Sequence, residues 1–171
     1  MNLDYQHLVP SDFHGNSRVW IYQSNRLFTF QEALNLEPQL EQFSANWQSH
    51  GTPVKAAAFL FFGQFIILMA DETVTGVSGC STDSSVRFIK SIEGQFGVSL
   101  FDRTTLGFIV NDKVQLLPMS QLGYAYEKGF ITEETLFFDN TIQTKAEFLN
   151  RWIVPISQSW LAKRLNHKIN G

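Results

Sequence analysis

The sequence predicts an α+β protein in which an antiparallel sheet packs against helices. Short runs of β-branched and aromatic residues end at turn residues, which is typical of strands. Two capping boxes each precede apolar residues at helical spacing. Hydrophobic residues make up 44% of the 171 residues and charged residues only 17%, so the chain can bury a substantial core and is not disordered.

The first predicted strand covers residues 18–23, RVWIYQ, and ends at Ser24. Alternation places three of its side chains on one face: Arg18, Trp20 and Tyr22. If that face were open, it would offer an aromatic surface for docking a partner. We favour a face covered by the C-terminal helices that carry Trp152 and Trp160, because a sheet that is apolar on both faces usually has two cover layers.

The first predicted helix begins after Thr29, because Thr29 and Glu32 have the spacing of a capping box. Apolar residues at helical spacing then continue to Trp47. Pro38 interrupts this pattern, since proline lacks the amide that a helix interior needs. The sequence therefore predicts either one kinked helix or two short helices.

Two apolar runs, residues 54–62 and 65–70, flank Gly63-Gln64. Glycine in the first position of a two-residue connection indicates a type II′ hairpin turn. Both runs are apolar on both faces, so the hairpin is expected at the centre of the sheet. A second helix is expected over residues 83–96, with Gly97 as its stop signal.

The rest of the chain adds a hairpin that turns at Asn111-Asp112, a short helix, a short strand, and a C-terminal helix that Pro155 kinks or divides. These elements cover residues 106–110, 113–117, 119–128 and 135–138, and the part of the chain after Thr144. The order through residue 117 is β-α-β-β-α-β plus one strand, which suggests a ferredoxin-like sandwich over residues 18–117. Residues 118–171 would pack on it as a helical extension of the same domain, and residues 1–17 would form an N-terminal arm.

Composition and charge exclude several classes of protein. The formal net charge is −3 and no run of Lys or Arg occurs, which argues against a nucleic-acid binder. The most apolar stretch, residues 56–70, contains a predicted turn and is too short for a membrane helix. The N-terminus lacks the basic start and apolar stretch of a signal peptide. A single Cys fits a reducing compartment, so we expect a cytoplasmic protein.

The loop over residues 71–85, DETVTGVSGCSTDSS, is the main candidate for a site. Amides at a helix start suit a phosphate or carboxylate, and they would also stabilise a thiolate at Cys80 just ahead of the helix. The candidate ligand-binding residues are Ser78, Gly79, Cys80, Ser81 and Asp83, and Cys80 is the candidate nucleophile. The alternative is that the polar residues only cap the helix and that Cys80 is a small buried filler.

Two other groups of titratable residues were considered. Asp71 and Glu72 form a carboxylate pair at a strand end, which is either a catalytic pair or a solvated turn. None of the histidines has metal-ligand spacing with Cys, Asp, Glu or another His: His7, His14, His50 and His167. We therefore expect no metal and no cofactor.

Four stretches carry a resemblance to known sequences: RVWIYQSNR (18–26), SGCSTDSSVRFIK (78–90), GVSLFDR (97–103) and FDNTIQTKAEF (138–148). They resemble an uncharacterised family of short bacterial proteins that often carry the label "ABC transporter ATPase". The resemblance covers most of the chain from Arg18 to Trp160. It implies membership of that family and no particular activity.

The residues do not support the ATPase label. Such an enzyme needs a P-loop, G-x-x-x-x-G-K-[ST], whose amides and lysine hold the phosphates. Lys55, Lys90 and Lys113 lack the preceding glycines, and residues 77–81, VSGCS, share only Ser-Gly with the L-S-G-G-Q signature. We therefore do not expect a P-loop ATPase.

No convergent catalytic set is visible, so the leading hypothesis is a non-enzymatic binding or interaction protein. The alternative is a small enzyme or an anion-binding protein that uses residues 76–85, with Cys80 as nucleophile or with backbone amides holding a phosphate. The expected partner is an unidentified protein or a small anionic ligand, with no nucleic acid and no membrane. The sequence leaves a homodimer open.

Overall fold

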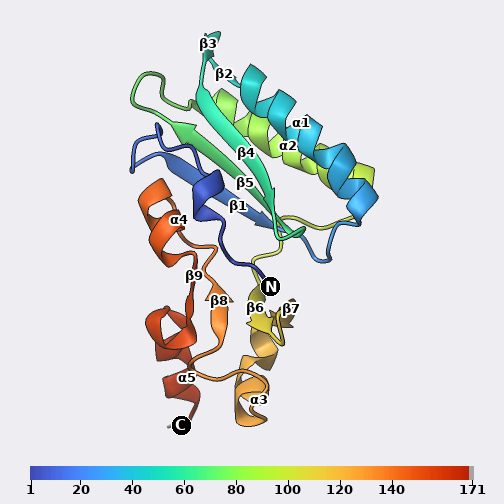
Figure 1. Ribbon diagram of the computed structural model, residues 1–171, viewed down its shortest axis with the longest axis vertical. Helices are drawn as coiled ribbons and strands as arrows, with labels where there is room; N and C mark the ends of the chain where they lie inside the picture. Colours follow the sequence, from blue (N-terminus) through green and yellow to red (C-terminus); the bar gives the residue numbers. More distant parts are fainter. Residues whose placement is uncertain (170–171) are drawn as a thin grey trace. The chain divides into compact units, whose positions relative to one another are not determined.

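Figure 1 shows the computed structural model, which describes the backbone of residues 1–169 and the side chains of residues 1–165. The α+β class is confirmed, because both helices and antiparallel sheets form. In chain order the elements are η1 (Gln6–Leu8), β1 (Arg18–Gln23), α1 (Phe30–Asn46), β2 (Gln48–Ser49), β3 (Thr52–Pro53), β4 (Lys55–Phe61), β5 (Phe65–Asp71), α2 (Gly79–Phe96), β6 (Thr105–Val110), β7 (Lys113–Pro118), η2 (Met119–Gln121), α3 (Leu122–Glu127), β8 (Leu136–Phe138), α4 (Lys145–Arg151), β9 (Ile153–Pro155), η3 (Ile156–Gln158) and α5 (Leu161–Ile169). Across the described residues, no helix combines the length and the apolar composition that crossing a bilayer requires.

The chain forms two compact units. The larger unit contains Asp4–Phe101 and Gln143–Leu149, and the smaller unit contains Met1–Leu3, Asp102–Ile142 and Asn150–Gly171. Compactness alone does not decide whether the two units fold separately. The predicted scheme of an arm over residues 1–17 and one domain over residues 18–171 therefore stays a prediction.

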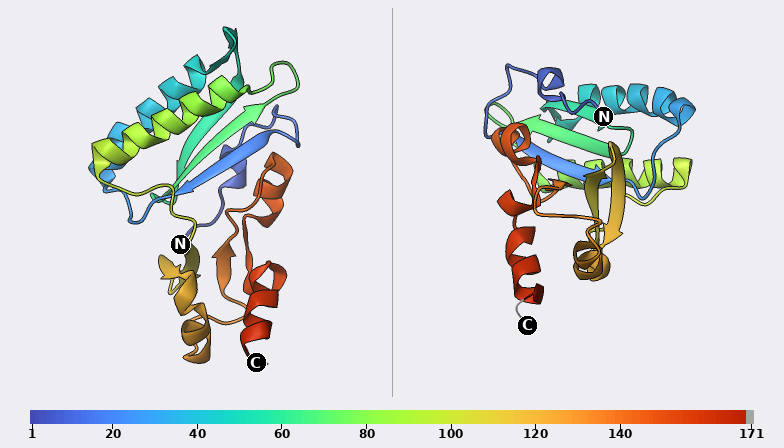
Figure 2. Two further views of the ribbon diagram at one scale, coloured as in Figure 1. Left: turned by 180° about the vertical axis from the view of Figure 1, so that it is seen from behind. Right: turned by 60° about the horizontal axis from the view of Figure 1, so that its bottom comes forward.

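The larger unit is built on a three-stranded antiparallel sheet with the order β1-β5-β4. α1 and α2 lie side by side on one face of this sheet (Figures 1 and 2). The core under the two helices consists of Tyr22, Phe28, Leu36, Leu40, Ile66, Leu68, Ile89, Ile92, Val98 and Leu100. Every residue of β5 is buried, whereas β4 is mostly half-buried because it lies at an edge. The prediction of a central hairpin is therefore right for β5 and wrong for β4.

The face of β1 that carries Trp20 and Tyr22 is covered, as the sequence indicated. Tyr22 lies in the core under α1 and α2, and the rings of Trp20 and Trp47 meet edge to face with their centroids 5.7 Å apart. The cover is α1 and α2, the helices of the same unit. The expectation that helices with Trp152 and Trp160 would supply this cover is wrong.

The opposite face of the sheet is covered by the N-terminal segment and by the start of α4. The rings of Tyr5 and Phe148 lie 5.1 Å apart, and the Tyr5 hydroxyl donates to the Phe148 backbone oxygen at 2.5 Å. The buried Lys145 donates from Nζ to the backbone oxygens of Pro10 and Phe13, at 2.6 and 2.7 Å. The segment from Tyr5 to Phe13 is therefore packed on the larger unit.

The predicted ferredoxin-like sandwich does not form. β1, α1, β4, β5 and α2 follow its order, but β6 pairs with β7 and β8 in a separate four-stranded sheet of order β7-β6-β8-β9. A bridge between Arg18 and Thr144 and a hydrogen bond from Val19 N to Gln143 O occupy the outer edge of β1 instead. A short returning segment thus takes the edge position where a fourth strand was expected.

The smaller unit has its own apolar core against its four-stranded sheet. This core consists of Leu106, Phe108, Leu122, Ala125, Ile131, Phe137, Ile156, Leu161 and Leu165. The turn between β6 and β7 is confirmed, since Asn111 and Asp112 both have positive φ and Val110 faces Lys113. The predicted C-terminal helix is divided into α4, β9, η3 and α5, because the segment ending at Pro155 pairs with β8 as a strand.

Two further details of the larger unit correct the sequence interpretation. α1 is one helix of 17 residues, so the alternative of two short helices is wrong. Pro38 lies on its exposed side between the buried Leu36 and Leu40, whose packing offsets the missing amide bond. The turn between β4 and β5 centres on Phe62 and Gly63, both with positive φ, which is type I′ geometry rather than type II′.

Candidate functional site

The residues that the sequence singled out lie at the start of α2. Ser78 is the N-cap and α2 begins at Gly79, so the exposed Cys80 lies in the first helical turn rather than ahead of the helix. Asp83 is exposed on the same helix. The expectation that the helix begins at residue 83, and the alternative of Cys80 as a buried filler, are both wrong.

The polar groups at this helix start bond within the protein. Ser81 N donates to Ser78 Oγ at 3.2 Å, Thr82 N donates to Ser78 O at 2.9 Å, and Ser81 Oγ donates to Gln48 O at 2.9 Å. None of the cavities described below is lined by Ser78, Gly79, Cys80, Ser81 or Asp83. This is the geometry of a capped helix start, and a ligand site at these residues stays a prediction.

Asp71 acts as a structural anchor in this fold. Its carboxylate accepts hydrogen bonds from Thr73 N and Oγ1 and from His14 N, and it lies 3.4 Å from Lys55 Nζ. Burial alone would raise the pKa of Asp71, but these partners outweigh burial and lower the pKa below its usual range. Glu72 accepts from Val77 N at 2.7 Å. Both carboxylates therefore hold local backbone in place.

A cavity of about 330 Å³ brings His14, Ser17 and Asp71 together, which raises the question of a catalytic triad. His14 Nδ1 accepts from Asn16 N at 3.1 Å, so this nitrogen cannot donate to Asp71 as a triad requires. Ser17 Oγ is buried and has no hydrogen-bond partner among the described residues. The hydrolase arrangement is therefore not assembled. Within the described side chains no cluster of His, Cys, Asp and Glu could hold a metal, and the side chain of His167 lies outside them.

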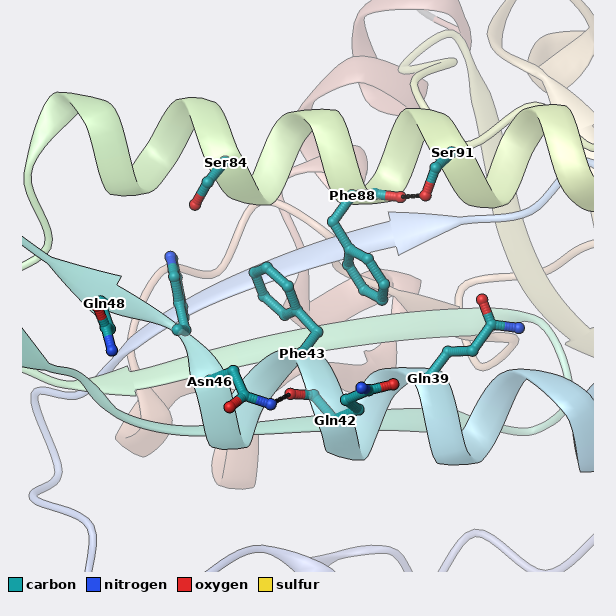
Figure 3. Close-up of a pocket in the computed structure, with 9 residues that line it drawn as sticks. Gln39, Gln42, Phe43, Asn46, Gln48, Ser84, Phe88 and Ser91 are labelled. Atoms are coloured by element: carbon teal, nitrogen blue, oxygen red, sulfur yellow. Dashed lines mark hydrogen bonds between the residues drawn. The ribbon is translucent and has the colours of Figure 1, made fainter. Parts of the chain in front are cut away.

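A groove of about 820 Å³ lies between α1 and α2 (Figure 3). Its lining combines carboxamides, hydroxyls and aromatic rings: Gln39, Gln42, Phe43, Asn46, Trp47, Gln48, Ser84, Phe88 and Ser91. We call it the amide groove. None of these nine lining residues is charged.

Helix periodicity creates the two walls of the amide groove. Residues three, four and seven positions apart on one helix lie on one face. α1 contributes Gln39, Gln42, Phe43 and Asn46 at this spacing, and α2 contributes Ser84, Phe88 and Ser91. Because the α1 end at Asn46 lies near the α2 start, the two stripes face each other along antiparallel helices (Figure 3).

Polar contacts tie the two helices together at both ends of the groove. At one end Arg26 forms a two-bonded pair with Glu32, at 2.8 and 2.9 Å, and also donates to the Phe96 backbone oxygen at 2.6 Å. The bonds from Arg26 lower the pKa of Glu32 to about 2. At the other end Trp47 Nε1 donates to Ser81 O at 3.0 Å. These ties fix the spacing of the helices and hence the width of the groove.

Aromatic rings form the base of the groove. Phe43 and Phe88 point toward one another from opposite helices and stack, with centroids 4.3 Å apart and ring planes within 4° (Figure 3). Trp47 extends the strip, with its centroid 5.3 Å from that of Phe43. Both Phe rings are only half-buried, so they offer apolar surface to a ligand.

Four polar side chains of the groove each donate one hydrogen bond within their own helix. Gln39, Asn46, Ser84 and Ser91 each donate to a backbone oxygen of their own helix, over distances of 2.6 to 2.9 Å. Only an NH₂ or OH group can donate to a carbonyl, so these contacts fix which atom is the donor. Ser84 and Ser91 have thus used their only donor and offer oxygen lone pairs to the groove, whereas Gln39 and Asn46 each keep one further N–H besides their carbonyl oxygen.

Gln42 and Gln48 differ from the other polar residues of the groove. Both side chains are exposed, and neither has a hydrogen-bond partner in the part of the chain that the structure describes. Each carboxamide can therefore donate and accept at once. The groove as a whole therefore offers both acceptors and carboxamide donors, and its lining contains no acid or base.

The sequence pattern includes Phe43 in the apolar stripe that runs to Trp47, and it did not predict the amide groove. The available signal was polar rather than apolar: Gln39, Gln42 and Asn46 have the same helical spacing as a core stripe. Uncharged amides on three successive turns of one face are unusual, because exposed helix faces are generally rich in charges. The opposing stripe on α2 became visible only after the helices packed.

Comparison with protein-family models, with curated proteins and with solved structures found no match for the chain. The resemblance to short bacterial proteins therefore stays a prediction. Fold and geometry define the class: an α+β protein of two compact units with an uncharged, amide-lined groove on the larger one.

Proposed function

We propose that this protein is a non-enzymatic binding protein whose amide groove holds a neutral, hydroxyl-rich ligand such as an oligosaccharide. The observation that carries the proposal is a groove of nine uncharged residues, whose carboxamides and hydroxyls can form hydrogen bonds beside the half-buried rings of Phe43 and Phe88. Such a lining can bind and orient a ligand, but it offers no group to transfer protons.

The absence of charge in the lining argues for a neutral ligand. A charged ligand would lose hydration on entering the groove and would find no opposite charge there. The alternative of an anion bound at residues 76–85, with Cys80 as nucleophile, is the weaker proposal. A helix start alone does not define a site, and its first-turn groups bond to Ser78 and Gln48.

The mixture of hydrogen-bond acceptors and carboxamide donors in the groove suits hydroxyl groups. Hydroxyls rotate to donate wherever an acceptor lies, and they accept in turn from amides such as those of Gln42 and Gln48. A sugar ring also presents C–H faces that can pack on Phe43 and Phe88.

The cytoplasm is the proposed compartment. The chain has one cysteine, Cys80, which cannot form an internal disulfide and is exposed as a free thiol. Exposed free thiols fit a reducing environment.

The proposal is tested by titrating the protein with neutral gluco- and chito-oligosaccharides and following amide chemical shifts by NMR. We expect saturable shifts at α1 and α2, and binding about fivefold weaker in Gln42→Ala, since a neutral hydrogen bond contributes about 1 kcal/mol. Gln95→Ala is the matched control, because Gln95 is exposed on α2 and does not line the groove. A uronic-acid oligosaccharide should bind more weakly than its neutral counterpart.

Two results would contradict the proposal. One is the absence of saturable shifts at α1 and α2 with every neutral oligosaccharide. The other is binding that Gln42→Ala leaves unchanged while the variant keeps its fold. Gln42 has no partner that the fold requires, so loss of binding in this variant reports on the groove itself.

A further inference from the structure

A second surface of the larger unit, the free edge of β4, has the features of a strand-addition site. β4 pairs with β5 on one side only, because the sheet order is β1-β5-β4. Within the described chain, the backbone groups of residues 56–60 have no hydrogen-bond partner outside the β5 ladder. Half of the amides and carbonyls in this stretch therefore point away from the sheet, ready to pair with another strand.

A groove of about 460 Å³ follows this edge. One wall is α1, which runs beside β4 in Figure 1, and the groove is lined by Leu8, Glu37, Leu40, Glu41, Ser44 and residues 56–61. Successive residues of a strand belong to opposite faces of the sheet, yet residues 56–61 of β4 all line the groove. The groove therefore runs along the strand edge rather than over a face, and we call it the edge groove.

β4 lacks the devices that normally protect a sheet edge. Its register with β5 is unbroken from Lys55 opposite Asp71 to Phe61 opposite Phe65, so it contains no bulge. Its sequence, KAAAFLF, has no proline and a single charge at its start, and three consecutive alanines leave the backbone accessible. The other edge of the sheet differs, because Thr144 bridges to β1 there.

The charges of the edge groove indicate the chemistry of its occupant. Glu37 and Glu41 are its only charged lining residues, and both are exposed on α1. Neither carboxylate makes an ion pair or a hydrogen bond with any residue that the structure describes. Two uncompensated carboxylates beside an apolar strand select an occupant with positive charge.

The spacing of these carboxylates matches an extended chain. Glu37 and Glu41 are one helical turn apart, which is about 6 Å along the helix axis. Alternate residues of a strand are about 6.6 Å apart and point to the same face. A strand added to β4 would thus place two cations opposite Glu37 and Glu41 if Lys or Arg occupied alternate positions.

A second copy of β4 fits this groove poorly. The one cation of β4 is Lys55, whose Nζ lies 2.9 Å from Asp12 Oδ2 and 3.4 Å from Asp71 Oδ2. It is therefore committed within its own chain and cannot neutralise Glu37 and Glu41 of another copy.

We propose that the edge groove binds an extended segment of a partner protein by strand addition to β4, with Lys or Arg at alternate positions facing Glu37 and Glu41. Main-chain hydrogen bonds to residues 56–60 supply sequence-independent affinity. The alternate side chains of the segment point away from α1 and are apolar, since they lie beside Phe59 and Leu8. This inference is independent of the amide groove, which lies between the two helices.

The experiment measures binding of a short fluorescent peptide of alternating Lys and Val by anisotropy at low salt. We expect saturable binding that weakens about tenfold in the double variant Glu37→Gln/Glu41→Gln, because two exposed ion pairs are lost. The matched control is Glu127→Gln/Glu134→Gln, which makes the same change in net charge at exposed residues of the smaller unit. The same peptide with alternate amides N-methylated should bind at least about tenfold more weakly, because it cannot pair with a strand.

Three outcomes would overturn the proposal. The first is that the Lys/Val peptide does not bind. The second is equal binding by the N-methylated peptide or by the Glu37→Gln/Glu41→Gln variant, which would mean general attraction to an acidic protein. The third is a stable dimer of the wild type that dissociates in Ala58→Lys, which would identify a second copy as the occupant of the edge.

Discussion

The two faces of the three-stranded sheet are covered by different physical means. On one face α1 and α2 form a helical layer whose inward side chains, such as Leu36 and Ile89, are fully buried. On the other face the N-terminal segment is mostly irregular and is held by polar anchors: Tyr5, Asp71 and Lys145. A helix satisfies its own backbone and needs only an apolar face, whereas an irregular segment needs specific partners for its backbone groups.

This comparison predicts that the helix-covered face contributes the larger share of stability. Leu36→Ala removes a fully buried side chain from the core under α1 and α2. We expect it to lower the free energy of unfolding by about 3 kcal/mol, because the lost transfer energy and the new cavity add together. Urea denaturation followed by circular dichroism measures this loss, which should not vary with pH between about 4 and 8, since no titratable group is removed. A loss below about 1 kcal/mol would show that this layer is not the main source of stability.

The apolar stripes of α1 and α2 could be predicted from the sequence, but neither the sheet face that they cover nor the polar contacts of the other face could. The apolar spacing of Leu36 and Leu40, and that of Ile89 and Ile92, is a local signal that periodicity reveals. Lys145 and Pro10 are 135 residues apart, and no local sequence pattern around either residue predicts their contact. A buried lysine among backbone oxygens is a tertiary feature only.

The candidate sites likewise divide into one that a local sequence motif indicates and two that only the packing of the helices creates. The start of α2 attracted attention because glycines, hydroxyls and Cys80 form a local motif, yet its polar groups serve the helix cap. The amide groove and the edge groove both depend on where α1 packs, against α2 on one side and beside β4 on the other. The hairpin of β6 and β7 followed from a local turn signal, whereas no local pattern could show that β6 also pairs with β8.

On the face covered by the N-terminal segment, the stability that Asp71 contributes should depend on pH. The pKa of Asp71 is lowered in the folded protein, while the unfolded carboxyl keeps an ordinary value of about 4. The stability that Asp71 contributes is therefore present above about pH 4 and is lost as the pH falls toward the folded pKa. We expect Asp71→Asn to cost about 2 kcal/mol near neutral pH, since hydrogen bonds to a charged group are lost. Below about pH 4 the difference between wild type and variant should shrink.

Urea denaturation of both proteins at a series of pH values provides this measurement. Other carboxylates with lowered pKa values, such as Glu32 and Asp102, titrate in both proteins and cancel in the difference. Glu134→Gln is the control, because it makes the same change in net charge at an exposed residue. A difference between wild type and Asp71→Asn that is constant across the acid range would contradict the anchoring role of this carboxylate.

The smallest expected loss of stability comes from removing the hydrogen bond between Tyr5, in the N-terminal segment, and Phe148, in α4. Tyr5→Phe keeps the buried ring beside Phe148 and removes only the hydroxyl that donates to the Phe148 backbone oxygen. The expected cost is about 1 kcal/mol near neutral pH. Tyr124→Phe is the matched control, because the Tyr124 side chain is largely exposed and its change should leave stability unaltered.

The pH dependence of unfolding at alkaline pH distinguishes the loss of the Tyr5 hydroxyl from a packing defect. Burial raises the pKa of Tyr5 from its ordinary value of 10.0 to about 12. Between these values the unfolded phenol has lost its proton while the folded one retains it, so rising pH favours unfolding. Wild type should therefore lose stability more steeply than Tyr5→Phe above about pH 10, and the two free energies of unfolding should converge. Equal slopes for the two proteins across this range would mean that the Tyr5 hydroxyl is hydrated, and the polar anchoring of this face would then rest on Asp71 and Lys145 alone.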